Sequence, residues 1–281
     1  MQLHEDKFEF MQHVLSKDAI LLHELPFVVY EQLYKTSQGN LMYPVDSVRD
    51  LGVKLCANFS WTPHINQIAS RARQASSWIL SVFKARDRQT MLTLYKSLIR
   101  SHLEYCCRLW HPYNSVANTQ ILENVQRVFT SKIHNCKELV YWSRLKTLHL
   151  MLLQRRRERY IVIYVWKIIQ GVAPHDISLA WDFNARLGIK VHVPPHRQNS
   201  RLKDSMSIIG PRLWNTLPKN RTLMESLQTF KSSVKEFCGQ FPDRPPIKGY
   251  PSSKNSILGY ALIKLPNTIR EQEVGSTAGL V

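Results

Sequence analysis

Residues 60–84 read SWTPHINQIASRARQASSWILSVFK, and this stretch decides the expected fold. Thr62 is suited to the N-cap of a helix and Pro63 to its first turn. Apolar residues then recur at steps near 3.6, namely Ile65, Ile68, Ala72, Ala75, Ile79, Val82 and Phe83. The spacing predicts an amphipathic helix over about 62–84, with Arg71 and Arg73 off its apolar stripe.

The helical period continues towards the C-terminus. It predicts a second helix over about 88–110, ended by Pro112, and a third over about 117–134. A short helix follows within LVYWSRLKTLHL (139–150), and a longer one over 151–171 ends at Gly171, a suitable C′ glycine.

The last third of the chain changes character. Residues 172–199 read as irregular, and a final helix over about 223–237 is expected to pack with Trp214. From residue 240 onward Pro, Ser, Gly and Lys prevail, which predicts a mostly disordered tail over 240–281.

The N-terminal part instead favours strands. Residues 27–34 and 42–55 are rich in β-branched side chains, and SQGN between them is a turn signal. We expect a mainly α protein, with a small antiparallel β segment followed by a helical bundle and a helical C-terminal unit. The expected domains are 1–58, 59–171, 172–239 and the tail 240–281.

The charge balance indicates the class of partner. Lys and Arg number 38 against 21 Asp and Glu, for a net charge of +17, and a field of that sign attracts nucleic acid. No apolar run approaches the roughly 20 residues of a membrane span, and MQLHEDKFEF is no secretory signal. Five scattered cysteines favour reduced thiols, so we expect an intracellular protein, nuclear or cytoplasmic, not secreted and without a membrane partner.

The stretch SLIRSHLEYCCRLWHPY (97–113) raises the question of a metal site, because it holds His102, Cys106, Cys107 and His111. Tetrahedral zinc needs four converging ligands. Neighbouring helical residues point about 100° apart, so the two cysteines cannot face one metal from the same helix. No second cluster supplies the missing ligands, and we favour a buried helix face and no metal.

Two groups of basic residues are candidates for phosphate contacts. One lies along or just after the first helix: Arg71, Arg73, Lys84, Arg86 and Arg88. The other lies within QRRRERY: Arg155, Arg156, Arg157 and Arg159. The second group is equally compatible with phosphate contact and with a solvated helix start that has Glu158 as its local partner. No nucleophile elbow, Walker loop or pair of adjacent aspartates points to catalysis.

Three ordered segments carry a family resemblance. They are DSVRDLGVKLCANFSWTPHINQIASRARQASSWIL (46–80), LYKSLIRSHLEYCCRLWHPY (94–113) with ILENVQRVFT (121–130), and GPRLWNTLPKNRTLMESLQTFKSSVKEF (210–237). Together they resemble the C-terminal part of LINE-type, non-LTR retrotransposon reverse transcriptases of the jockey and chicken-repeat kind, over about 3–237. The sequence departs from that family in its CC, where small apolar residues are common.

The resemblance implies the end of the palm, then the thumb and the C-terminal helical region. It implies that Asp50, Leu51, Gly52 and Val53 form a primer-grip-like turn and that Arg71 and Arg73 lie near the template–primer duplex. It also implies that the metal-binding aspartates, the Mg²⁺ of the parent enzyme, and the rest of the palm and the fingers belong upstream of Met1.

The sequence thus predicts a fragment of an RNA-directed DNA polymerase that is inactive alone, has no catalytic residues, and keeps the binding of RNA or RNA–DNA duplex. Its expected contacts are the basic residues named above, without Arg88. The alternatives are a domesticated protein-interaction module, a non-functional transposon remnant, and a zinc-binding protein.

Overall fold

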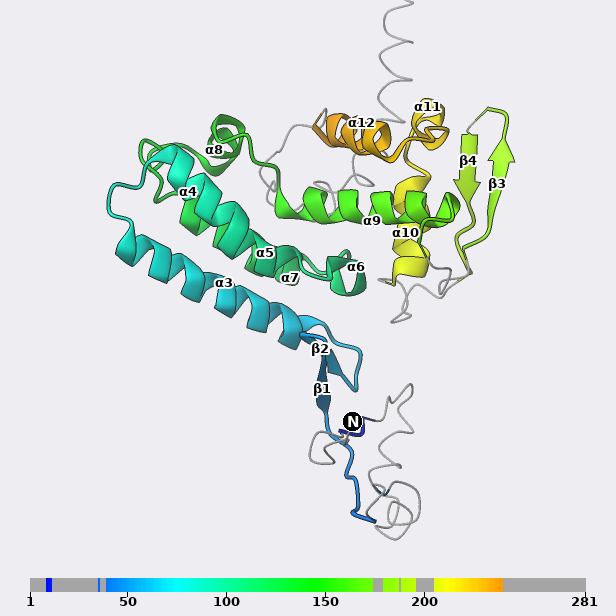
Figure 1. The fold of residues 1–281 in the computed structure, drawn as a ribbon, viewed down its shortest axis with the longest axis horizontal. Helices are drawn as coiled ribbons and strands as arrows, with labels where there is room; N and C mark the ends of the chain where they lie inside the picture. Colours follow the sequence, from blue (N-terminus) through cyan, green and yellow to red (C-terminus); the bar gives the residue numbers. More distant parts are fainter. Residues whose placement is uncertain are drawn as a thin grey trace, which may run out of the picture. The chain divides into compact units, whose positions relative to one another are not determined.

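The computed structural model describes residues 9–11, 35, 39–173, 179–186, 188–195 and 205–239. The strand expected over 27–34 and the tail expected over 240–281 lie outside these ranges. The chain divides into two units, Met1–Gln67 and Ile68–Val281, and the division falls inside the first long helix. The mainly α fold with small antiparallel sheets is confirmed (Figure 1).

The first unit contains a β-hairpin. Strands β1 (Ser47–Asp50) and β2 (Val53–Cys56) pair antiparallel, and Asp50 faces Val53 at the closed end. Leu51 and Gly52 form the two-residue loop with φ of 44° and 87°, the geometry of a type I′ turn, which matches the twist of the strands. The strands expected within 42–55 are therefore present as one hairpin.

Helix α3 (Thr62–Val82) begins where the sequence predicts and ends two residues early. Its apolar stripe is buried along most of the helix, since Ile65, Ala72 and Ile79 have no exposed surface, but Val82 at the end is 54% exposed. In the first unit the backbone N–H of Lys54 donates to Nδ1 of His64 at 3.1 Å. The imidazole of that first helical turn therefore satisfies a backbone group of β2.

The helix expected over 88–110 runs without interruption over 88–104 and breaks at 105–106. It consists of α4 (Arg88–Leu94), a π-helical turn η3 (Tyr95–Ile99), α5 (Arg100–Glu104) and α6 (Cys107–Trp110). The chain breaks after Glu104 because Tyr105 is extended and Cys106 is left-handed, with φ of 48°. The indole N–H of Trp110 donates to the carbonyl of Tyr105 at 2.8 Å and fixes the break.

The next three helices match the sequence prediction closely. They are α7 (Val116–Thr130), α8 (Tyr141–Thr147) and α9 (Leu153–Ile169). Gly171 has φ of 66°, its N–H donates to the carbonyl of Ile168, and the N–H of Val172 donates to that of Lys167. This is a Schellman motif, so the prediction that Gly171 ends the helix is confirmed.

Residues 172–199 were expected to be irregular, and this expectation is wrong because they contain a second hairpin. Strands β3 (Trp181–Asn184) and β4 (Gly188–Val191) pair antiparallel. The other edge of β4 bonds to side chains from later in the chain: Trp214 donates to the Ile189 carbonyl, and Asn215 pairs both ways with Val191 at 2.8 and 3.0 Å. Side chains therefore complete the edge strand, which a local pattern cannot reveal.

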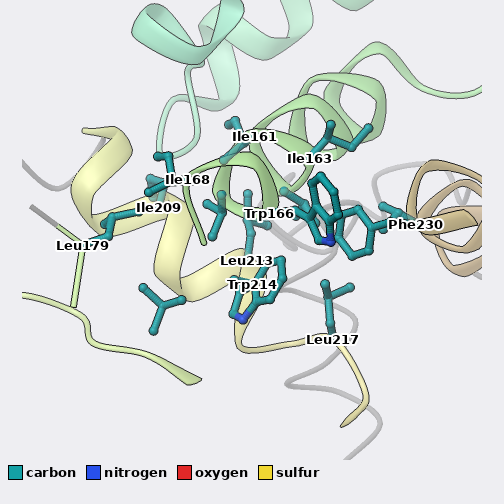
Figure 2. Packing of buried hydrophobic residues seen from close by; sticks show 14 of the residues in the cluster. Ile161, Ile163, Trp166, Ile168, Leu179, Ile209, Leu213, Trp214, Leu217 and Phe230 are labelled. Carbon is teal, nitrogen blue, oxygen red and sulfur yellow. The ribbon is translucent and has the colours of Figure 1, made fainter. Parts of the chain in front are cut away.

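The main core of the second unit lies between α9, α10 (Met206–Trp214) and α12 (Leu227–Gly239), with α11 (Lys219–Thr222) joining the last two. Phe230 lies against Trp166 and Trp214, with ring centroids 5.6 and 5.8 Å apart (Figure 2). The expected packing of Trp214 on the last helix is confirmed. Helix α9 thus shares one core with 206–239, across the boundary expected at 171/172.

Candidate nucleic-acid interface

Helix α3 presents one of its two expected arginines to solvent. Arg73 is exposed, whereas Arg71 is half-buried. Arg73 also lines a cavity of about 620 Å³ together with Arg127 and Asn124 of α7 and Trp142 of α8. The guanidinium of Arg127 lies over the Tyr141 ring, 5.0 Å from its centroid. The cavity therefore has a cationic rim on its α3 and α7 sides.

Three turns of the second unit meet beyond the ends of α3, α7 and α8. The N–H of His134 donates to the carbonyl of Arg86 at 3.0 Å, and the guanidinium of Arg88 donates to the carbonyl of Thr147. We call this region the basic end, and its cationic or imidazole side chains are Lys84, Arg86, Arg88, Lys132, His134, Lys137, Lys146 and His149. All except the half-buried Arg86 are exposed.

Backbone strain gathers at the basic end. Arg86, Asn135 and His149 all have positive φ, at 51°, 58° and 51°. Non-glycine residues adopt this conformation rarely and at a cost, so the surrounding turns must hold them in it. Asp87 caps α4 by accepting from the N–H of Thr90 at 2.9 Å, an arrangement that lowers the pKa of its carboxyl. The turns are thus fixed in the geometry that brings their cations together.

The arginine cluster of α9 requires a correction, because half of it does not face solvent. Arg155 and Arg157 are 2% and 0% exposed. Arg155 donates to the carbonyl of Cys238 at 3.4 Å, and Nε of Arg157 donates to Nδ1 of His111 at 3.2 Å. Buried guanidinium groups that hold α9 against its neighbours cannot reach a phosphate, so we remove both from the candidate interface.

The other two arginines of the cluster are half-buried. Arg156 binds both oxygens of Glu104, at 2.5 and 3.1 Å, so its charge is already neutralised. Arg159 donates to the carbonyl of Lys231 at 3.0 Å, while its Nε is buried and has no hydrogen-bond partner among the described residues. Of the four, Arg159 alone borders a surface groove.

A polar network lies beneath the surface between α7 and α9. The carboxylate of Glu123, 7% exposed, accepts from the N–H of Leu153 at 3.0 Å, from the amide of Gln126 at 3.1 Å and from the hydroxyl of Tyr141. Burial, and then the charge of Glu123, raise the pKa of Tyr141 well above its usual value. Glu123 thus caps the first turn of α9 and links it to α7 and α8.

The surface groove lies between α5, α6, α9 and α12, with a volume of about 670 Å³. Its basic side chains are Arg108, Arg159, Lys167 and Lys231, and its aromatic ones are Tyr105, Tyr160 and Tyr164. We call it the tyrosine groove. Sequence reasoning missed its cations except Arg159, as it missed Lys132, His134, Lys146 and His149, because none of them is next to another basic residue in the sequence.

The cysteine stretch is only partly the buried face that the sequence favours. Cys107 is buried, which raises the pKa of its thiol to about 11, but Cys106 is half-exposed at the helix break and lines the tyrosine groove. His111 is buried against Arg157, while His102 is exposed. Across the described ranges, no three His, Cys, Asp or Glu side chains are grouped to hold a metal ion.

That finding also bears on the Mg²⁺ that the family resemblance implies. Among the described residues, no group of three or more His, Cys, Asp or Glu side chains could hold such an ion. The primer-grip-like residues form the tip of the first hairpin, where Leu51 is 84% exposed and Val53 is buried. None of the helices in the described part of the chain is long and apolar enough to span a membrane.

No protein-family model, curated protein or solved structure matches this chain. The family resemblance therefore depends on the sequence motifs alone, and the function must be argued from the charged surfaces.

Proposed function

We propose that the chain binds RNA or RNA–DNA duplex through phosphate contacts, as the end of the palm, the thumb and the C-terminal helical region of a LINE-type reverse transcriptase. The basic end is the observation that carries this proposal. Three turns distant in sequence bring Lys84, Arg88, Lys132 and Lys146 to one end of the unit, with only Asp87 and Glu138 as acids in those turns. Such a surface favours a polyanion.

The position of α3 supports contact with an extended ligand. A helix rises about 1.5 Å per residue, so Arg73 and Lys84 are separated by about 16 Å along the axis. A duplex strand carries one phosphate per about 3.4 Å, so the two residues can contact different phosphates of the same strand. Contacts of this kind position a duplex without reading its sequence.

The proposal assigns binding and not nucleotidyl transfer to these residues. Of the contacts expected from the sequence, the exposed Arg73 and Lys84 remain, and the half-buried Arg71 and Arg86 are secondary. The partners of Arg156 make it a scaffold residue, and Arg159 belongs to the tyrosine groove. The basic end adds Arg88, Lys132 and Lys146.

A salt titration tests the proposal. The affinity for an RNA–DNA duplex is measured by fluorescence anisotropy over several salt concentrations. The triple variant Lys84→Gln, Lys132→Gln, Lys146→Gln should reduce the slope of log K against log salt by about 2 to 3, since each phosphate contact contributes about 0.9.

The control is a second triple variant that removes equal charge elsewhere: Lys96→Gln, Lys190→Gln, Lys235→Gln, all three exposed. Its slope should stay near that of the unmodified chain. Absence of binding at low salt, or an equal loss in both triples, would show that the basic end is not the binding surface.

A further inference from the structure

The tyrosine groove carries a positive charge that the described residues do not compensate. Arg108, Arg159, Lys167 and Lys231 reach it from α6, α9 and α12, and none of them forms an ion pair with a carboxylate among the described residues. The one acid in its lining, Glu104, is bound by Arg156 at 2.5 Å and lies 3.7 Å from Arg100. The tyrosine groove therefore has a net positive charge.

The groove also contains aromatic rings held in fixed positions. The guanidinium of Arg108 covers one face of Tyr164, 4.1 Å from the ring centroid. The hydroxyl of Tyr160 accepts from Arg156 at 2.9 Å and donates to Glu104 at 3.3 Å. Rings fixed in this way lose little conformational entropy when a flat ligand stacks on them.

Tyr105 is the most exposed of the three aromatic rings that line the groove. The break after Glu104 places it outside the helix with 54% of its surface exposed, and the bond from Trp110 to its carbonyl keeps it there. Single π-helical turns inside α-helices are frequent at functional sites, and η3 lies just before this break. The break therefore leaves the ring of Tyr105 exposed beside the groove, where a base can stack on it.

We propose that the tyrosine groove binds an unpaired segment of nucleic acid, with phosphates along the four cations and bases stacked on the tyrosines. A positively charged groove combined with aromatic rings is the arrangement by which proteins bind single strands without reading sequence. A paired duplex keeps its bases stacked on each other, so it cannot use the rings. The inference rests on the proposed binding of nucleic acid and specifies which form of it this groove takes.

The first measurement compares ligands on the full chain. Anisotropy is recorded with a single-stranded RNA, a single-stranded DNA of the same sequence, and a blunt RNA–DNA duplex. Tyr105→Ala should weaken binding of at least one single strand by between about 5-fold and about 150-fold, the value of one base–aromatic stack, and leave the duplex unchanged. Tyr43→Ala is the matched control, because Tyr43 is 53% exposed and lies far from the groove in sequence.

The second measurement locates the ligand. Cys106 is half-exposed in the groove, and the other four cysteines are buried, so a small alkylating reagent reports on this site when the modified peptides are identified by mass spectrometry. A saturating single strand should slow alkylation of Cys106 severalfold. The blunt duplex, at a concentration that saturates the protein, should not.

The outcomes separate the two proposals. If single strands bind but leave the alkylation rate of Cys106 unchanged, or if Tyr105→Ala weakens them no more than Tyr43→Ala does, the groove is not their site. If inorganic polyphosphate protects Cys106 as well as RNA does and Tyr105→Ala has no effect, the groove is only an anion site and the inference fails. If the blunt duplex alone fails to bind, the duplex proposal fails while the groove proposal survives.

Discussion

Glu123 offers the sharpest test of what holds α9 in place. Its buried carboxylate accepts from the N–H of Leu153, the first residue of α9, and from side chains of Gln126 and Tyr141. The change Glu123→Leu keeps a side chain of comparable size and removes all of these acceptors. We expect the protein to lose a large part of its stability.

The magnitude follows from what is left unpaired. The amide of Gln126 still donates to the hydroxyl oxygen of Tyr141 at 2.8 Å. The hydroxyl proton of Tyr141 and the N–H of Leu153 both lose their acceptor, and each unpaired buried donor costs about 1–3 kcal/mol. Arg157 is also affected: burial lowers its pKa, and the charge of Glu123 is the largest effect in the opposite direction. The two unpaired donors set the expected loss at about 2–5 kcal/mol, because neighbouring contributions overlap and do not add in full.

Urea denaturation at pH 7 measures this loss as a lower midpoint with an unchanged m-value. Glu123→Gln should fall between the two forms, since it keeps an acceptor oxygen and loses the charge. Glu138→Gln, at an exposed loop position, is the control and should stay within about 0.5 kcal/mol of the unmodified chain. If Glu123→Leu costs less than about 1 kcal/mol, the network does not hold α9 and our reading of the buried charges is wrong.

Three further predictions concern the core and the turns. Burial and the nearby guanidinium hold the pKa of His111 well below its usual value, so below about pH 6.5 only the unfolded chain binds a proton at this residue. The free energy of unfolding should therefore fall towards lower pH, by up to about 1.4 kcal/mol per pH unit. In urea titrations at several pH values, His111→Gln should remove this component of the pH dependence. Gly188→Ala should reduce the free energy of unfolding clearly more than Gly171→Ala in the same assay. Both glycines have positive φ, but of the two only Gly188 is crowded: its new methyl would lie 2.1 Å from the hydroxyl oxygen of Thr222. Equal losses of stability would count against the close packing of β4. Phe230→Ala should cost about 3–5 kcal/mol, because it empties a fully buried site between two tryptophans, and a loss below 2 kcal/mol would mean that the core collapses to fill it.

The sequence predicts helices well where one apolar stripe decides them, as in α3, α7 and α9. It fails at Tyr105 and Cys106, where the helical pattern continues but the chain breaks. The bond that fixes this break involves the indole of Trp110, and periodicity counts that side chain only as one more apolar residue. A local pattern therefore records which face is buried and not where the backbone changes direction.

The second hairpin was missed for a related reason. Strand β4 is stabilised by side chains of Trp214, Asn215 and Thr222, which lie more than 20 residues further along the chain. In the sequence, Trp214 and Asn215 fall within LWN, one of the motifs behind the family resemblance. Their contacts give these residues a structural role, so a motif that helps to identify a family need not mark its binding site.

The charged residues show the same limit of a local sequence pattern. The run of arginines in α9 is the most obvious basic feature of the sequence, yet Arg155 and Arg157 are buried and Arg156 is neutralised by Glu104, a residue 52 positions earlier. Most of the cations available to a ligand stand singly in turns and helices, so no run of basic residues marks them in the sequence. A dense run on one helix must place some of its charges towards the core when that helix is packed on several sides, as α9 is, because successive residues point all round the axis. In this protein we therefore expect binding to follow the exposed charges that the tertiary fold brings together, and the arginine run to determine stability.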